Sequence, residues 1–83
     1  MPLYMDVRNN VDGLTTEAAA AAHKADLSMQ AKHGVDYKQY WFDIDTGRIF
    51  CHVEAPNKEA AEAVHWEAHG MVVDEITEVR EGS

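Results

Sequence analysis

Two histidines one helical turn apart are the residues of this sequence whose types and spacing point most directly to chemistry. They are His65 and His69, in the segment VHWEAHG. On a helix, residues four apart lie only about 40° from each other around the axis. Glu67 lies two residues after His65 and projects roughly 200° away, so the zinc-protease motif, in which glutamate directly follows the first histidine, does not apply. The histidine pair itself predicts a metal site.

A third ligand is available on the same stripe of this predicted helix. Glu62 precedes His65 by three residues, and Glu-x-x-His is a helical arrangement of carboxylate-bridged metal proteins. Two imidazoles and one carboxylate suit nickel, zinc, iron or copper. Because imidazoles bind metals only when neutral, affinity is expected to fall as the pH drops through about 6.5. A solvated polar flank without a metal is the alternative.

Polar residues also occupy the sector of the first predicted helix that should face the core. His23 and Asp26 lie there, opposite a charged sector. An unpaired buried polar group costs roughly 1 to 3 kcal/mol, so these side chains need partners. Either they satisfy each other at their i, i+3 spacing, or they bind a ligand or metal. His52, on a predicted strand, is a further candidate ligand.

The elements that must position these residues follow from hydrophobic periodicity and end signals. Alternating residues predict strands at 3–9, 37–45, 48–55 and 76–80. One helix is expected from Thr15 to about Lys32, before Gly34, and a second over residues 58–69, before Gly70. The order βαββαβ predicts a single ferredoxin-like α+β domain over residues 1–83, an antiparallel sheet with two helices on one face.

The hairpin between the second and third predicted strands assigns residues to the two faces of the sheet. With Thr46 and Gly47 at the tip, the register pairs Ile44 with Ile49, Phe42 with Cys51 and Tyr40 with Val53 on the core side. The single cysteine, Cys51, is then expected to be an inert core thiol.

The opposite face of the sheet carries aromatic side chains that the helices would not cover. It holds Trp41 directly across from His52, together with Phe50 and, from the first strand, Tyr4. Exposed aromatic residues on an open sheet usually mark an interface. A small domain also gains core from association. The sequence therefore predicts a homodimer formed through this face.

Composition excludes several classes of partner. The chain has 83 residues, with 15 acidic against 7 basic ones and a formal charge of -8, which repels nucleic acid and anionic membranes and attracts cations. Five histidines add neutral ligands for transition metals. One cysteine cannot form an internal disulfide, and no stretch reads as a leader or membrane span. We expect a soluble cytoplasmic protein.

Two longer segments resemble a known family. They are AHKADLSMQAKHGV (residues 22–35) and DTGRIFCHVEAPNKEAAEAVHWEAHG (residues 45–70), with F-C-x-V-E-A-P and H-x-x-A-H-G as their most specific parts. They are similar to the small bacterial ferredoxin-like nickel-binding proteins. The resemblance implies a homodimeric sandwich that binds Ni²⁺ or another divalent transition metal as a store, buffer or metal-responsive protein, with no known catalytic activity.

The resemblance does not assign ligands, so helix geometry supplies them: His65, His69 and Glu62 first, then His23, Asp26 and His52. A different class of function also fits the fold. Dimeric ferredoxin-like domains include small enzymes of the monooxygenase and isomerase types, with pockets between helix and sheet. There His23 would act as general base and Asp26 would orient it. A fold alone does not decide between them, and metal binding without catalysis is the preferred prediction.

Overall fold

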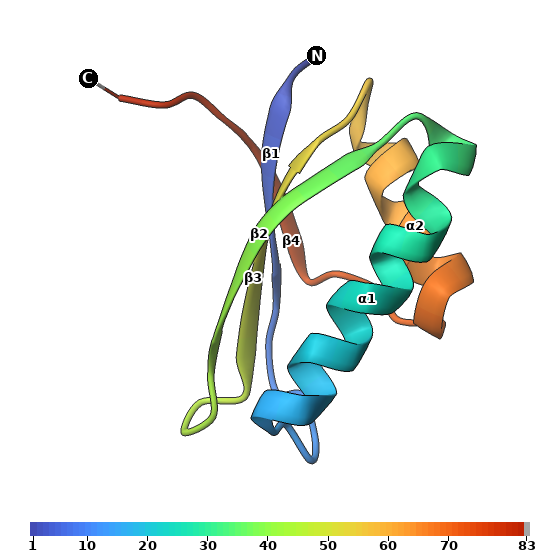
Figure 1. Cartoon of the computed structure of the whole chain (residues 1–83). Helices are drawn as coiled ribbons and strands as arrows, with labels where there is room; N and C mark the ends of the chain where they lie inside the picture. Colours follow the sequence, from blue (N-terminus) through green and yellow to red (C-terminus); the bar gives the residue numbers. More distant parts are fainter. Residues whose placement is uncertain (83) are drawn as a thin grey trace.

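The computed structural model describes residues 1–82 and has six elements in the predicted order. They are β1 (Leu3–Arg8), α1 (Thr16–His33), β2 (Asp36–Asp43), β3 (Arg48–Glu54), α2 (Lys58–His69) and β4 (Glu75–Val79). The strands form one antiparallel sheet in the order β2-β3-β1-β4. Both helices cover the same face of this sheet (Figure 1). The predicted ferredoxin-like α+β fold is confirmed.

Local signals fix the ends of both helices. The side chains of Thr15 and Asn57 each accept a hydrogen bond from the backbone N–H three residues later, at 3.0 Å and 2.8 Å, which satisfies amides that have no partner in the first turn. Gly34 and Gly70 end the helices in the left-handed conformation, with φ of 66° and 69°. The predicted helix ends are therefore right, and they place His65 and His69 in the last two turns of α2. No helix in residues 1–82 combines the length and apolar character that a membrane crossing requires.

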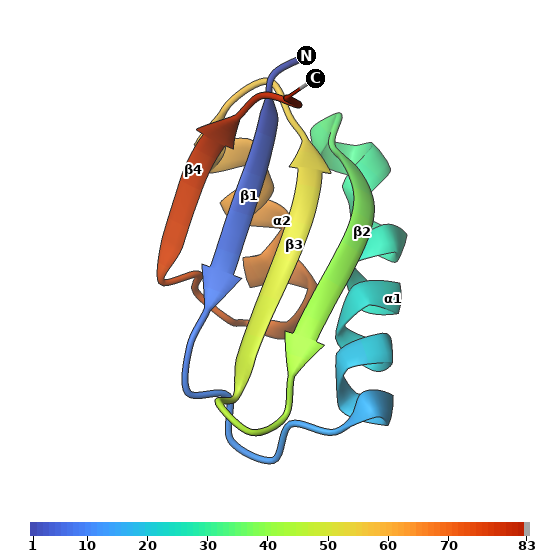
Figure 2. The ribbon, with the colours of Figure 1, turned by 90° about the vertical axis from the view of Figure 1, so that its left-hand side faces the viewer.

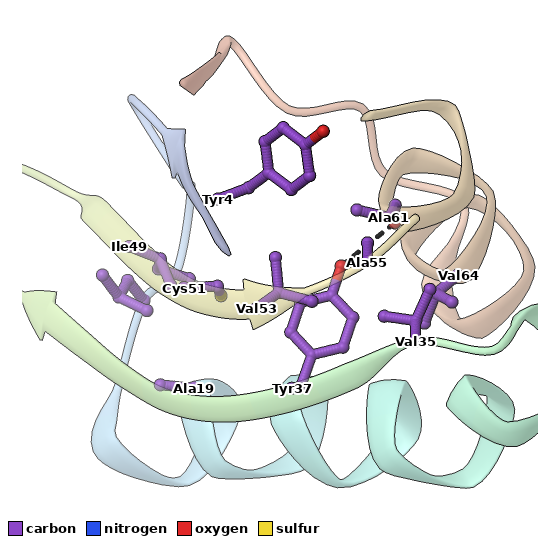
Figure 3. Packing of buried hydrophobic residues seen from close by; sticks show 11 residues of the cluster. Tyr4, Ala19, Val35, Tyr37, Ile49, Cys51, Val53, Ala55, Ala61 and Val64 are labelled. Carbon is purple, nitrogen blue, oxygen red and sulfur yellow. Dashed lines mark hydrogen bonds between the residues drawn. The ribbon is translucent and has the colours of Figure 1, made fainter. Parts of the chain in front are cut away.

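The hydrophobic core lies between the sheet and the two helices (Figure 3). Val53 on β3 and Val64 on α2 are completely buried. Tyr37 on β2 reaches under α2, where its hydroxyl donates a hydrogen bond of 3.0 Å to the carbonyl of Ala61. Burial, and then the nearby Asp6 and Asp26 carboxylates, raise the pKa of Tyr37. The phenol of Tyr37 therefore stays protonated, and its O–H continues to donate this hydrogen bond to Ala61.

The predicted register of the β2–β3 hairpin is wrong by two residues. Phe42 pairs with Ile49 and Trp41 with Phe50. The reason is the turn, which spans residues 44–47 instead of two residues at the tip. Asp43 stabilises this longer turn, because its carboxylate accepts hydrogen bonds from the backbone N–H two residues on, at 3.2 Å, and from a threonine hydroxyl, at 2.8 Å. A shift of two keeps the strand side chains next to the turn on their predicted faces, whereas an irregularity between Tyr37 and Gln39 turns Tyr37, 3% exposed, into the core.

The placement of Tyr4 on the open face is also wrong. Tyr4 is only 5% exposed and belongs to the buried cluster (Figure 3). It shares the helix side of β1 with Asp6, whose side chain contacts α2. The alternation of β1 was assigned to the wrong face because a charged residue lies in the core. Trp41, 48% exposed, remains on the open face that Figure 2 presents to the viewer.

Candidate metal centre

His65 lies buried between two carboxylates from different elements. Its Nε2 is 2.9 Å from Oδ2 of Asp6 on β1, and its Nδ1 is 2.9 Å from Oδ1 of Asp26 on α1. None of the three residues is more than 2% exposed. Both ring nitrogens are therefore held by carboxylates, and the ring orientation is fixed from two sides.

His69 completes a triangle of ligand atoms at the same place. Its Nε2 is 3.0 Å from Asp26 Oδ1 and 3.3 Å from His65 Nδ1. In an octahedral site with bonds of about 2.1 Å, neighbouring ligand atoms lie about 3.0 Å apart. Asp26, His65 and His69, called the helix triad from here on, thus have the spacing of one octahedral face. Two histidines and one carboxylate on such a face are a known arrangement for divalent transition metals.

The packing of the two helices explains how the triad assembles. The i, i+4 spacing places His65 and His69 on one side of α2, and α1 packs against that helix. Asp26, in the middle of α1, then meets both imidazoles.

The charges of the site depend on these hydrogen bonds. Burial alone would lower the pKa of His65, but hydrogen bonds to Asp26 and Asp6 outweigh burial and raise this pKa from 6.5 to about 9. Burial alone would raise the pKa of Asp26, but hydrogen bonds from His65 and His69 lower it below its ordinary value. At neutral pH, His65 is therefore an imidazolium between carboxylates, and a metal must displace its Nδ1 proton.

A small cavity adjoins the triad. It has a volume of about 10 Å³ and is lined also by His23 and Tyr40, enough for about one water molecule. Within the described residues, Nδ1 of His23 and Nδ1 of His69 are buried without a hydrogen-bond partner. Two unpaired nitrogens beside a cavity favour a ligand or water there. The interpretation in which His23 and Asp26 satisfy each other is wrong, since Asp26 bonds both histidines of α2.

The structure separates the sequence-predicted ligands into three places. His65, His69 and Asp26 come together, and His23 lines the adjoining cavity. Glu62 is exposed and lies beside a different surface hollow, next to the side chain of Trp66. His52 lies on the open face of the sheet, in a hollow with Met5 and Trp41. The structure brings neither Glu62 nor His52 to the triad.

Sequence reasoning missed two residues of this region, Asp6 and Cys51. Both are buried next to His65. Asp6 could have been noticed as an acidic residue within an alternating strand. The prediction instead turned the set of residues that includes Asp6 away from the core. Cys51 was expected in the core and is there, 6% exposed. Burial, and then the Asp6 and Asp26 carboxylates, raise the pKa of its thiol.

Glu67 points away from the triad, as the helix geometry predicted. Its carboxylate is 2.9 Å from Nε2 of His33 and 3.3 Å from Nζ of Lys32, both in the last turn of α1. The hydrogen bonds with His33 and then Lys32 lower the pKa of Glu67. Its role is to join the C-terminal ends of the two helices.

Comparisons with known proteins agree with this description. Residues 4–79 match the family described as nickel responsive protein SCO4226-like. The chain is similar to the crystal structure of SCO4226 from Streptomyces coelicolor A3(2), with 37% identity and a TM-score of 0.89 over 98% of this chain and 99% of that one. A comparison with curated proteins found no match. The family expected from the sequence resemblance is confirmed: the chain belongs to the SCO4226-like nickel responsive proteins.

Proposed function

We propose that this protein binds a divalent transition metal, foremost nickel, through Asp26, His65 and His69, as a store, buffer or metal-responsive protein. The observation that carries the proposal is the spacing of the three ligand atoms, 2.9, 3.0 and 3.3 Å. It requires little rearrangement for a metal with bonds of about 2.1 Å. His23, which lines the adjoining cavity, is the candidate for a fourth ligand.

The choice of nickel combines ligand chemistry with the family. Imidazole suits nickel, zinc, copper and iron alike, so the ligand set alone does not select among them. The description of the family as nickel responsive supports nickel. In the loaded state, Nδ1 of His65 ligates the metal while Nε2 keeps its proton and donates to Asp6. Such an outer carboxylate fixes the tautomer and orientation of the ligand ring.

Replacing His69 with alanine should remove nickel binding at the triad. His69 is the most suitable position, because its side chain is 12% exposed and its loss leaves His65 between its two carboxylates. Calorimetric titration of chelator-stripped protein should show one binding event fewer per chain. His52→Ala, on the open sheet face, is the matched control and should titrate like the parent.

The same titration distinguishes Asp26 from the ligand first expected. If Asp26 is the carboxylate ligand, Glu62→Gln should leave the nickel affinity unchanged. If Glu62 is the ligand, the same variant should lose most of this affinity. A His69→Ala variant that binds nickel like the parent would refute the proposal.

We also propose that two copies associate through the open face of the sheet. Trp41 is 48% exposed there, and its cross-strand partner Phe50 is half-buried. An exposed aromatic side chain on an open sheet favours association. Light scattering should give about twice the 9.3 kDa chain mass. Trp41→Lys should shift the protein toward the monomer, because it places a charge in an apolar interface. A parent that is monomeric at high concentration would contradict this proposal.

A cytoplasmic location is part of the proposal, because the single cysteine is buried and unpaired. The enzyme alternative has less support. Asp26 bonds the histidines of α2, so the expected pairing with His23 as base and orienter is not formed. A cavity of about 10 Å³ admits nothing much larger than water.

A further inference from the structure

A second group of metal-ligand atoms shares His65 with the helix triad. It consists of a carboxylate oxygen of Asp6, the Sγ of Cys51 and a ring nitrogen of His65, all within 4.8 Å of one another. Asp6 on β1 and Cys51 on β3 are direct cross-strand partners, so the sheet holds them side by side. The three residues are 1%, 6% and 2% exposed. The group is therefore built into the core.

One atom of this group has no hydrogen-bond partner. Oδ2 of Asp6 accepts from His65, but its Oδ1 is buried and unpaired within the described part of the chain. An unpaired buried carboxylate oxygen is costly, and such atoms in native proteins require an explanation. A cation bound beside Asp6 would satisfy it. The neighbouring sulfur and nitrogen are the other two ligand types of zinc sites.

We propose that Asp6, Cys51 and His65 form a second metal site, specific for thiophilic divalent ions such as zinc, cobalt or cadmium, which competes with the helix triad for His65. A tetrahedral centre of this kind needs ligand atoms about 3.4 to 3.8 Å apart. The three atoms already lie within 4.8 Å, so a contraction of about 1 Å closes the site. The thiolate and carboxylate cancel the charge of the ion, and a neutral complex is the least costly to bury.

Competition follows from the chemistry of one imidazole ring. A neutral imidazole has a single lone pair, so His65 ligates through Nε2 or through Nδ1 but not through both. A metal on Nε2 leaves the Nδ1 proton to bond Asp26, and a metal on Nδ1 leaves the Nε2 proton to bond Asp6. Each carboxylate orients the ring for the opposite site. This competition rests on the proposed nickel site, whereas the thiolate site itself does not.

The thiol must lose its proton for this site to form. A thiolate is the ligand, so loading releases the Cys51 proton to solvent. The bond that forms is between the metal and sulfur, and no oxidant or reductant is needed. This gives the site an optical signature that the triad lacks, because only the thiolate site produces sulfur-to-metal charge-transfer absorption.

The test is titration of reduced, chelator-stripped protein with cadmium or cobalt while recording that absorption. The parent should develop the band to one equivalent per chain, and Cys51→Ser should abolish it. His69→Ala should keep the band, which separates this site from the triad. If nickel binding fails but the band appears, the thiolate site stands and the proposed function falls.

Two further measurements keep the inference testable if Cys51→Ser does not fold. Bound cadmium should protect the thiol of the parent from alkylation, and Asp6→Asn should weaken cadmium binding at least tenfold. Absence of the band in folded parent protein would overturn the site. Equal cadmium affinity of the parent and Asp6→Asn would also overturn the proposed site, since Cys51 would then bind cadmium without Asp6. Cadmium binding that is unaffected by bound nickel would overturn the competition.

Discussion

The variant His65→Ala is expected to lose about 3 to 5 kcal/mol of unfolding free energy at pH 7, together with nickel binding. Removing one partner of a buried ion pair leaves a charge without compensation, which costs about that much. Here the loss would leave Asp6, 1% exposed, without its histidine and Asp26, 2% exposed, with His69 alone. Urea denaturation followed by tryptophan fluorescence measures the effect.

A matched control comes from the other face of the sheet. His52→Ala removes an imidazole that lies outside the buried cluster, in a hollow of the open sheet face, and it should change stability little. The double variant of His65→Ala with Asp26→Asn should recover part of the loss, because it removes one stranded charge. A loss below about 1 kcal/mol in His65→Ala would show that the buried ion pairs are not formed in solution.

The metal-free protein should become less stable as the pH rises from about 6.5 past 9. The pKa of His65 is raised from 6.5 to about 9 in the folded chain. Its contribution is therefore fully present below 6.5 and is lost as the pH passes through the folded value. A shift of this size corresponds to roughly 3 kcal/mol. Thermal unfolding across this range, with the His69→Ala variant as a comparison that retains His65, measures the loss.

The same group sets the pH dependence of nickel binding. A metal must displace the Nδ1 proton of His65, so affinity should continue to rise up to about pH 9 instead of levelling off above 6.5. The sequence suggested the lower value because it contains no sign that carboxylates hold the ring. Stability or affinity that is constant between pH 7 and 9 would contradict the buried imidazolium.

Local sequence determined most of the secondary structure. The ends of both helices follow from Thr15, Asn57, Gly34 and Gly70, whose effects act within one turn. The order of elements then restricted the topology to one common fold. The neighbouring positions of two histidines on α2 are equally local, because a helix fixes any i, i+4 pair.

The partners of those histidines were decided by tertiary packing. Asp26 is 39 residues from His65 in sequence, and Asp6 is 59 residues away. Glu62 was favoured over both because it shares the helix, but its side of α2 faces solvent. Helical periodicity orders residues around an axis without saying which side the other helix and the sheet cover.

The face assignment of β1 shows the same limit. Period-2 alternation gave two sets of residues, and hydrophobicity favoured burying Leu3 over Tyr4. Tyr4 and Asp6 face the helices instead, and the buried charge of Asp6 is offset by the imidazolium of His65. The two charges come within 2.9 Å of each other only in the folded chain. The interaction that makes burial of the Asp6 carboxylate favourable is therefore absent from the local sequence around β1.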